Sequence, residues 1–383
     1  MTPGKRRVAL LIETSPAYVR ELAHGVAQYN REHGNWVIHL ERHAPHAPPP
    51  KWLKTWKGDG ILVRTSNRRM ARAVIATGLP SVAFRWGIHA AGLPSIGPDN
   101  RGVAQLAAAH LRERGFRHFA CCGLTEGPQP ELDERVRAFV EEIGALEFRC
   151  QVFRVDPKRS AEREQKRITQ WIKSLPKPVG LMACNDANGL HVLNACAWAE
   201  VKVPDEVAVV GVGNDDCLCT LCHPPLSSID LAPRSIGYDA AALLDRIMQG
   251  EPNEGPQILV PPRRVVTRLS TDVVATEDSS VSRAVAFIRE RACQGIHIGD
   301  VLRHVKLSRS VLEPRLKRSL GRTIHREIQR VQIERVKELL ASTELPIKQI
   351  AAQTGFRYLQ YLTRVFSKAT HQTPARYRKQ MRR

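Results

Sequence analysis

Near its C-terminus the chain reads IKQIAAQTGFRYLQYLTRVF, from Ile347 to Phe366. Apolar residues in this stretch recur at the spacing of one face of an α-helix. Gly355 interrupts the pattern, and glycine adopts the positive φ angles of a tight turn at little cost. A short helix, a tight turn and a second amphipathic helix form the layout of a helix-turn-helix. The stretch therefore predicts such a unit over about 347–371.

The same pattern occurs a second time, about fifty residues upstream. It reads IGDVLRHVKLSRSVLEPRLKRSL, from Ile298 to Leu320, and predicts a first unit over about 298–321. Between the two copies, the apolar residues of Ile324–Ser342 follow the period of one long helix. We expect this helix to hold the units at a fixed separation, so that they enter successive major grooves on one face of DNA.

The second copy resembles the signature of the AraC/XylS family of transcription regulators, and the resemblance covers about the last hundred residues. It rests on Ile350-Ala351, Gly355-Phe356, Tyr361-Leu362, Arg364, Phe366, Lys368, Thr373-Pro374 and Tyr377-Arg378. In that family the second helix of each unit reads bases. The resemblance therefore implies DNA contacts by Arg309, Ser310 and Glu313 in the first unit, and by Arg357, Gln360, Thr363 and Arg364 in the second.

These residue types suit base recognition. Arg pairs bidentately with guanine, Gln pairs with adenine, and Glu accepts a hydrogen bond from cytosine. A solvated helix face is the alternative for each residue taken singly. The apolar positions on the same helices, Leu312, Leu316, Leu362 and Phe366, are expected in the core.

Two residues depart from the family pattern. His371 stands where the family has a Gly that ends the second recognition helix. His can occupy the left-handed cap at a modest penalty, and both an altered and an unaltered helix end stay open. Pro314 lies early in the first recognition helix, where it removes a backbone donor. We therefore expect that helix to start near Val311, which would alter the contacts of the first unit.

The net charge of +20 is concentrated at the same end of the chain. From Asp278 to Arg383 there are 23 Lys and Arg residues against 8 Asp and Glu residues, a net charge of +15. Such an excess in the last quarter of the chain is typical of a module that binds a polyanion, and a merely basic solvated surface is the alternative. The charge supports double-stranded operator DNA as a partner.

The preceding part of the chain alternates short apolar stretches with stretches of helical period. The expected strands are Arg7–Ile12, Trp36–Leu40, Gly60–Val63, Ser81–Phe84, His118–Cys122, Gly180–Ala183 and Val207–Val212, with closing strands at Gln257–Val260 and Val265–Leu269. Such alternation predicts parallel sheets with helices on both faces, and this length holds two such α/β units in tandem.

This part resembles the effector domain of LacI-type repressors, which share the fold of periplasmic sugar-binding proteins. The resemblance rests on Asp99-Asn100, Gly115-Phe116, Cys184-Asn185-Asp186, Asn214-Asp215-Asp216 and Pro224-Pro225-Leu226-Ser227-Ser228. It implies a two-lobed effector domain over 1–275, a linker over 276–280 and an all-α DNA-binding domain over 281–383. Such a domain ahead of an AraC-type pair resembles the bacterial xylose operon regulators. This implies a homodimer, RNA polymerase as a further partner, and a small sugar effector, D-xylose or another small polar ligand. An activator and a repressor both stay open.

A sugar site needs bidentate hydrogen-bonding groups and an aromatic face. Asp186 follows one expected strand, and Asn214 and Asp215 follow another, so they fall on loops at the carboxyl ends of strands. Arg135 matches the arginine that contacts sugar in LacI-type proteins. Tyr18 and Trp86 follow strands of the first lobe and could stack on the sugar. A helix-capping role is the alternative for Asp186, and we expect Asp99 to be a helix N-cap.

Other classes of function have less support. The chain has no GxxxxGK[ST], GxSxG or HExxH motif, so we expect neither an enzyme nor a cofactor. Catalysis on pentoses or nucleosides, and nonspecific tethering to DNA, are the alternatives. Cys217, Cys219, Cys222 and His223 lack a second pair of ligands, which favours buried or loop thiols over a metal site. The nine unevenly spaced cysteines and the absence of a secretion signal or membrane span predict a cytoplasmic protein.

Overall fold

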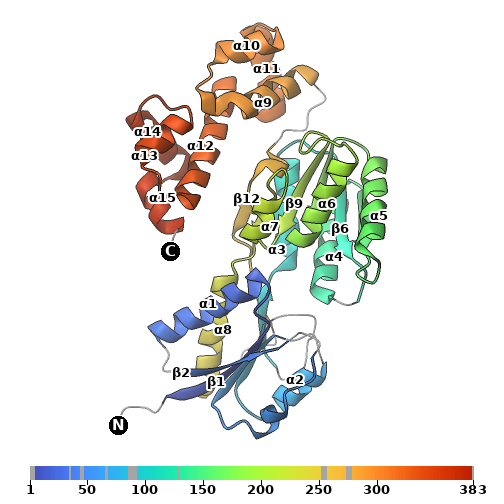
Figure 1. Ribbon diagram of the computed structural model, residues 1–383, viewed down its shortest axis with the longest axis vertical. Coiled ribbons are helices and arrows are strands. Elements are labelled where there is room, and N and C mark those ends of the chain that lie inside the picture. The colour runs from blue at the N-terminus through green and yellow to red at the C-terminus, as the bar shows by residue number, and fades with distance from the viewer. Residues whose placement is uncertain are drawn as a thin grey trace. The chain divides into compact units, whose positions relative to one another are not determined.

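The computed structural model describes residues 5–33, 36–43, 47–64, 68–84, 93–127, 129–251, 257–272 and 278–381. The chain divides into two compact units (Figure 1). One comprises Met1–Glu113 with Arg117–Asp272, and the other comprises Val273–Arg383 with the short segment Arg114–Phe116.

The first unit contains two six-stranded sheets, one in each lobe. The first sheet has the order β11-β5-β4-β3-β1-β2, and all of its strand pairs are parallel. Its strands are β1 (Arg6–Ile12), β2 (Trp36–Arg42), β3 (Gly60–Arg64), β4 (Ser81–Phe84), β5 (Ser95–Pro98) and β11 (Gln257–Val260). Its helices are α1 (Ala17–Glu32), η1 (Lys51–Thr55), α2 (Arg68–Ile75) and α8 (Pro233–Met248).

The side chains of β1 show why this sheet is covered on both faces. Successive side chains of a strand point to opposite faces. Val8, Leu10 and Ile12 pack against α1 and α8, whereas Ala9 and Leu11 pack against η1 and α2. Because both sets are apolar, the strand is stable only between two layers of helices, as the uninterrupted apolar run indicates.

The second sheet has the order β12-β10-β9-β8-β6-β7, and only β12 is antiparallel to its neighbour. Its strands are β6 (His118–Leu124), β7 (Cys150–Val155), β8 (Val179–Ala183), β9 (Val207–Val212), β10 (Ser227–Asp230) and β12 (Arg264–Val266). Its helices are α3 (Asn100–Arg112), α4 (Pro130–Ala145), α5 (Ala161–Ser174), α6 (Asp186–Trp198), α7 (Asp216–Leu221) and η2 (Leu269–Thr271).

The predicted parallel sheets with helices on both faces are confirmed. Three strands were not expected, namely β5, β7 and β10. The strand β5 carries Gly97 and Pro98, and β10 begins with two Ser residues. These residue types give little sequence signal for a strand. The strand β7 is at the edge of its sheet and is half exposed, so it lacks a continuous apolar run. These strands are determined by their neighbours more than by their own composition.

The second unit is all helical. Its helices are α9 (Ser279–Arg291), η3 (Ala292–Gln294), α10 (Ile298–Val305), α11 (Arg309–Leu320), α12 (Ile324–Ser342), α13 (Ile347–Gln353), α14 (Leu359–Thr370) and α15 (Pro374–Met381). The long helix α12 has the expected bounds and contributes to two separate cores. Ile324 and Ile328 pack with α9, α10 and α11, and Val336 and Leu340 pack with α13, α14 and α15. It therefore joins two helix-turn-helix subdomains (Figure 1).

The ends of both recognition helices use left-handed residues. Gly321 follows α11 at φ 67°, and His371 follows α14 at φ 58°. The N–H of His371 donates to the carbonyl of Ser367, as the N–H of Gly321 does to Lys317. His371 thus occupies the left-handed cap, as a His can at a modest penalty, and α14 ends as α11 does at Gly321.

The expectation for Pro314 is wrong. The helix α11 begins at Arg309, two residues before the expected start, and Pro314 lies inside it. A proline in a helix interior removes the hydrogen bond to the carbonyl four residues earlier, here that of Ser310. The buried side chains of Leu312 and Leu316 hold the helix in place despite this loss.

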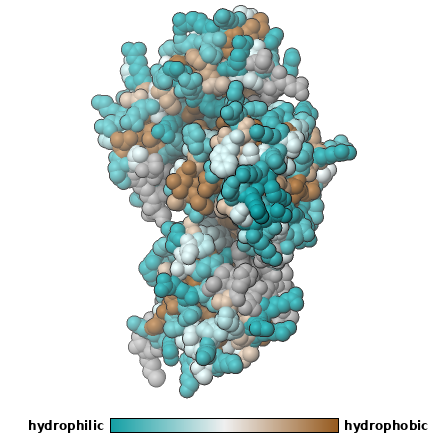
Figure 2. Space-filling view, turned by 45° about the vertical axis from the view of Figure 1, so that its right-hand side comes forward, coloured by the Kyte–Doolittle hydropathy of each residue, from teal (hydrophilic) through white to brown (hydrophobic). Residues whose placement is uncertain are grey.

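On the face shown in Figure 2, hydrophilic residues cover most of the surface, and apolar residues lie in small separate patches. None of the described helices has both the length and the apolar character that a membrane-spanning helix needs.

Candidate DNA-reading helices and effector site

The two recognition helices correspond residue for residue. Both have twelve residues, and α14 begins fifty positions after α11. Their buried residues match as well, since Leu312 and Leu316 correspond to Leu362 and Phe366. All seven residues expected to contact DNA lie on the other faces of these helices or just before them, where they are exposed or half exposed.

Arg364 on the outer face of α14, and Arg357 two residues before this helix, each lie beside a tyrosine ring. The guanidinium of Arg364 lies 5.2 Å from the ring centroid of Tyr361, and that of Arg357 lies 5.4 Å from the ring of Tyr358. The hydroxyl of Tyr361 accepts a hydrogen bond from Gln329 of α12 at 2.9 Å. Within the described residues neither arginine forms an ion pair, so both charges are available to DNA.

The remaining predicted contacts of α14 differ in their availability. Gln360 is exposed, so its side-chain amide is accessible. The hydroxyl of Thr363 donates to the carbonyl of Leu359 at 3.0 Å, which leaves its oxygen as an acceptor.

The outer face of α11 is paired within itself. Arg309 forms an ion pair with Glu313 one turn later, with 2.6 Å between Nε and Oε2. This hydrogen bond lowers the pKa of the Glu313 carboxyl. The hydroxyls of Ser310 and Ser308 lie 2.9 Å apart. The two predicted charged contacts of the first subdomain therefore neutralise each other.

A second group of polar residues gathers in the first unit, where parallel strands end. The buried side chain of Arg135, in α4, donates from Nε to Oδ1 of Asn100 at 3.1 Å, and from Nη1 to the carbonyl of Cys184 at 2.5 Å. Cys184 directly follows β8. Asn100, the first residue of α3, donates in turn to a carboxylate oxygen of Glu134 at 2.8 Å. Asp99 is the N-cap of α3, as expected.

Titratable side chains of both lobes surround Arg135. Burial lowers its pKa, and Cys184, Tyr18, Glu131 and Asp186 oppose this shift. Tyr18 belongs to α1, beside the first sheet, whereas the other groups belong to the second lobe. Side chains on both lobes therefore lie within electrostatic reach of one guanidinium.

Arg64, the last residue of β3, is a second buried arginine at the strand ends. It forms an ion pair with Glu13, which directly follows β1. Burial lowers the pKa of Arg64 to about 10, and Glu131 of the second lobe opposes this shift. At neutral pH Arg64 keeps its charge. The site therefore combines two arginines with several carboxylates.

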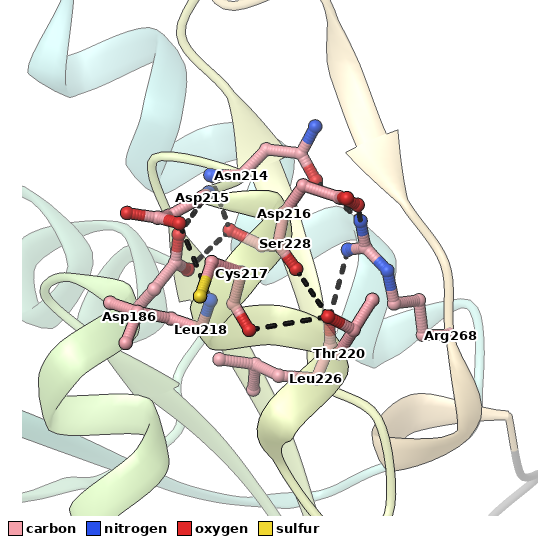
Figure 3. Close-up of polar contacts among 10 residues, drawn as sticks. All are labelled: Asp186, Asn214, Asp215, Asp216, Cys217, Leu218, Thr220, Leu226, Ser228 and Arg268. Carbon is pink, nitrogen blue, oxygen red and sulfur yellow. Dashed lines mark hydrogen bonds and ion pairs between the residues drawn. The ribbon is translucent and has the colours of Figure 1, made fainter. Parts of the chain in front are cut away.

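Asp186 is buried behind the loop that follows β9 (Figure 3). Its Oδ1 accepts a hydrogen bond from the hydroxyl of Ser228 at 2.5 Å, and its Oδ2 accepts one from the N–H of Asp215 at 2.8 Å. Burial raises its pKa, and these two hydrogen bonds oppose that shift. The N-cap of α6 is Asn185, so Asp186 has no need to cap that helix.

Asn214 and Asp215 are also bonded within this loop (Figure 3). The N–H of Asn214 donates to the hydroxyl of Ser228 at 2.9 Å, and its side-chain oxygen accepts from Arg268 at 3.0 Å. The side chain of Asp215 caps α7 by accepting from the N–H of Leu218 at 3.3 Å. Both residues hold the loop that carries them.

The structure therefore places Tyr18 and Asp186 near Arg135, and it places Asn214 and Asp215 on the loop next to Asp186. Trp86 lies outside the described residues. Sequence reasoning did not identify Glu13, Arg64, Asn100 and Glu131. Glu13 and Arg64 had a detectable signal, because each is a charged residue at the end of an uninterrupted apolar strand.

The cysteine cluster after β9 is part of the core. Cys219 and Cys222 are buried against the second sheet, and Cys217 is exposed. Burial raises the pKa of the Cys222 thiol to about 11, so it stays protonated at neutral pH. Among the described residues, no group of three or more His, Cys, Asp or Glu side chains is placed to hold a metal ion.

Two family models match this chain. A periplasmic binding protein-like domain matches residues 108–271, and a helix-turn-helix domain matches residues 301–380. The xylose operon regulatory protein of Escherichia coli strain K12 is 34% identical over 386 residues, which cover 99% of this chain and 98% of that protein. The chain belongs to the xylose operon regulator family. The Haemophilus influenzae protein of the same name is also 34% identical, over 99% of both chains.

A solved structure agrees with this assignment. The structure of a xylose-binding transcription activator is 32% identical, covers 99% of both chains and superimposes with a TM-score of 0.72. The present family member is thus a DNA-binding transcription regulator with a periplasmic-binding-protein-like domain and a helix-turn-helix domain. The predicted function class and fold class are confirmed, and its relatives are regulators, not enzymes.

Proposed function

We propose that this regulator binds D-xylose in its first unit and controls a sugar-utilisation operon in response. The observation that carries the proposal is the group of buried charged side chains where strands of both sheets end, in a chain similar over its whole length to xylose operon regulators. Buried charges persist where they are paired or bind a polar ligand. A regulator that responds to a different small sugar is the alternative.

The chemistry of the site suits a pentose. Vicinal hydroxyls of a sugar both donate and accept hydrogen bonds, and they match the planar guanidinium and carboxylate groups. Arg135 and Arg64 provide donors from the two lobes, and Glu13 and Glu131 provide acceptors. The ring of Tyr18, with that of Trp86, would cover the C–H face of the sugar.

Asp186, Asn214 and Asp215 stay predicted ligands. Each oxygen of Asp186 already accepts one hydrogen bond, and a carboxylate oxygen can accept a second. Because Asp186 also bonds Asp215, a sugar on Asp186 would act on the loop between β9 and α7. That loop is a route by which ligand binding could change the second lobe.

We propose that α11 and α14 enter successive major grooves of the operator. Arg357, Gln360, Thr363 and Arg364 would read bases from α14, where both arginines are free of ion pairs in the described part of the chain. Arg309, Ser310 and Glu313 would contribute less from α11, because its two charges are paired.

Several further properties belong to this proposal. Two copies of the chain would form a homodimer on the operator. The dimer would activate transcription by contacting RNA polymerase, and the protein would be cytoplasmic. The domains would comprise 1–275, 276–280 and 281–383. One relative of known structure is described as a transcription activator, which favours activation over repression.

The test is a calorimetric titration of the full chain with D-xylose, L-arabinose, D-ribose and D-glucose. We expect the tightest binding for D-xylose, and Arg135→Gln should weaken it by one to two decades, because a lost hydrogen bond to a charged group costs roughly 1.5–3 kcal/mol. Arg137→Gln is the matched control, since Arg137 lies on the same helix and is exposed. No heat with any pentose, or equal losses in the two variants, would overturn the proposed site.

A further inference from the structure

The N-cap residue of α14 is unusual. Tyr358 occupies this position with φ −130° and ψ 135°, and its side chain makes no capping hydrogen bond. N-cap positions favour Ser, Thr, Asp and Asn, whose oxygens accept from the free N–H groups of the first turn. Tyr358 therefore leaves this helix less stable than a capping residue would.

The corresponding N-cap position of the first subdomain holds a different type of residue. Fifty residues earlier, the N-cap of α11 is Ser308, which is a residue of the favoured type, although its side chain makes no capping hydrogen bond either. Tyr358 is 59% exposed, and the neighbouring Leu359 is 37% exposed. The ring of Tyr358 lies beside the guanidinium of Arg357. A large exposed ring at a position that prefers a small polar residue breaks a local rule of helix formation, which is expected at a functional position.

The position of Tyr358 and Leu359 at the N-terminus of α14 indicates which DNA group they would contact. The N-terminal residues of a recognition helix contact base edges in the major groove. The apolar group that the major groove displays there is the 5-methyl group of thymine. We propose that Tyr358, with Leu359 beside it, recognises a thymine 5-methyl group in the operator. The proposal rests on DNA binding by α14 and is independent of the sugar that the first unit binds.

The experiment removes single methyl groups from the DNA. A binding site is first selected from random duplexes with the full chain, with and without D-xylose. Each thymine of the selected duplex is then replaced in turn by deoxyuridine, which differs only in the missing methyl group. We expect wild-type affinity to fall about fourfold at one position, the value of one buried methyl group.

Variants then assign that position. Tyr358→Ser copies the residue of the first subdomain, and we expect it to bind the thymine duplex about fourfold more weakly and to lose the response to deoxyuridine. Tyr358→Phe keeps the apolar ring and should respond as the wild type does. Ser308→Ala is the matched control in α11 and should also keep the response. Tyr358→Asn, which carries another capping side chain, replaces the Ser variant if that variant fails to fold.

The proposal is overturned if no thymine responds, or if Tyr358→Ser keeps the response of the wild type. An equal loss of affinity for all sequences in Tyr358→Phe and Tyr358→Ser would show that the hydroxyl contacts a phosphate, which also overturns it. A failure to bind D-xylose would leave these measurements unchanged, so the two proposals fail separately.

Discussion

The two helix-turn-helix subdomains have the same architecture and different surfaces. In α11 the predicted contacts Arg309 and Glu313 pair with each other, and a proline occupies position 314. In α14 the corresponding position holds Arg364, which lies beside a tyrosine ring and has no ion pair among the described residues. A repeated scaffold thus carries one surface with paired charges and one with available charges. The comparison teaches that equal folds do not imply equal shares in base recognition.

The largest expected difference lies in the turns. Gly355 has φ +77°. A Cβ atom there would lie 2.8 Å from the backbone carbonyl oxygen of Ala292 and 2.8 Å from the side-chain nitrogen Nε2 of Gln332. Gly355→Ala should therefore lower the free energy of unfolding of the second unit by roughly 2–5 kcal/mol. The first turn uses Lys306 at φ 57°, which has no need of glycine.

Urea unfolding of the full chain measures this difference. All six Trp residues lie before residue 200, so Trp fluorescence reports the first unit, whereas circular dichroism follows the helices of both units. Lys306→Ala is the control and should change stability by less than about 0.5 kcal/mol. Equal effects of the two substitutions would show that the turns are equivalent and would break the comparison.

The next effect concerns Pro314. Pro314→Ala restores the hydrogen bond to the carbonyl of Ser310 inside α11, and we expect it to raise the free energy of unfolding of the second unit by about 1–3 kcal/mol. The matched change in α14, Arg364→Ala, should be nearly neutral for stability, because Arg and Ala have similar helix propensities. A loss of stability in Pro314→Ala, measured by the same urea titration, would mean that the proline is a packing residue.

The smallest effect concerns the helix ends. His371→Gly should stabilise the second unit by about 1 kcal/mol, because the left-handed conformation is costly for residues with a Cβ atom. Gly321→His should lower stability by a similar amount. Thermal unfolding of the two single variants, and of the variant that carries both substitutions, measures these changes in stability. Changes of the same sign in the single variants would refute the equivalence of the two caps.

Most of the fold could be predicted from the sequence, and part of the candidate site could be proposed from it. Uninterrupted apolar runs such as Val207–Val212 and the periodic residues of Ile324–Ser342 gave element bounds that the structure reproduces. Short strands rich in Ser, Gly and Pro carried no such pattern. Pro314 misled because proline is best tolerated in the first turn of a helix, which placed the expected start near Val311, whereas burial of Leu312 and Leu316 fixes the helix from Arg309.

The effector site was predicted less completely. Positions after strands could be found, since strand ends follow from the apolar runs, and this located Asp186. The partners of a buried charge come from distant parts of the chain, as Arg64 and Glu131 show. Their meeting depends on tertiary packing, which no local pattern in a single sequence reveals.

We propose that α14 reads bases more strongly than α11. The most direct measurement is the affinity of the full chain for a selected duplex in which every base pair is changed in turn, for wild type, Arg364→Ala and Arg309→Ala. Arg364→Ala should cost roughly 1–3 kcal/mol on the selected duplex and abolish discrimination at one base pair. Arg309→Ala should weaken discrimination by less than Arg364→Ala does, because the charge of Arg309 is paired with Glu313. An equal loss of discrimination in the two variants, or a uniform loss for all duplexes in Arg364→Ala, would contradict this ranking of the two helices.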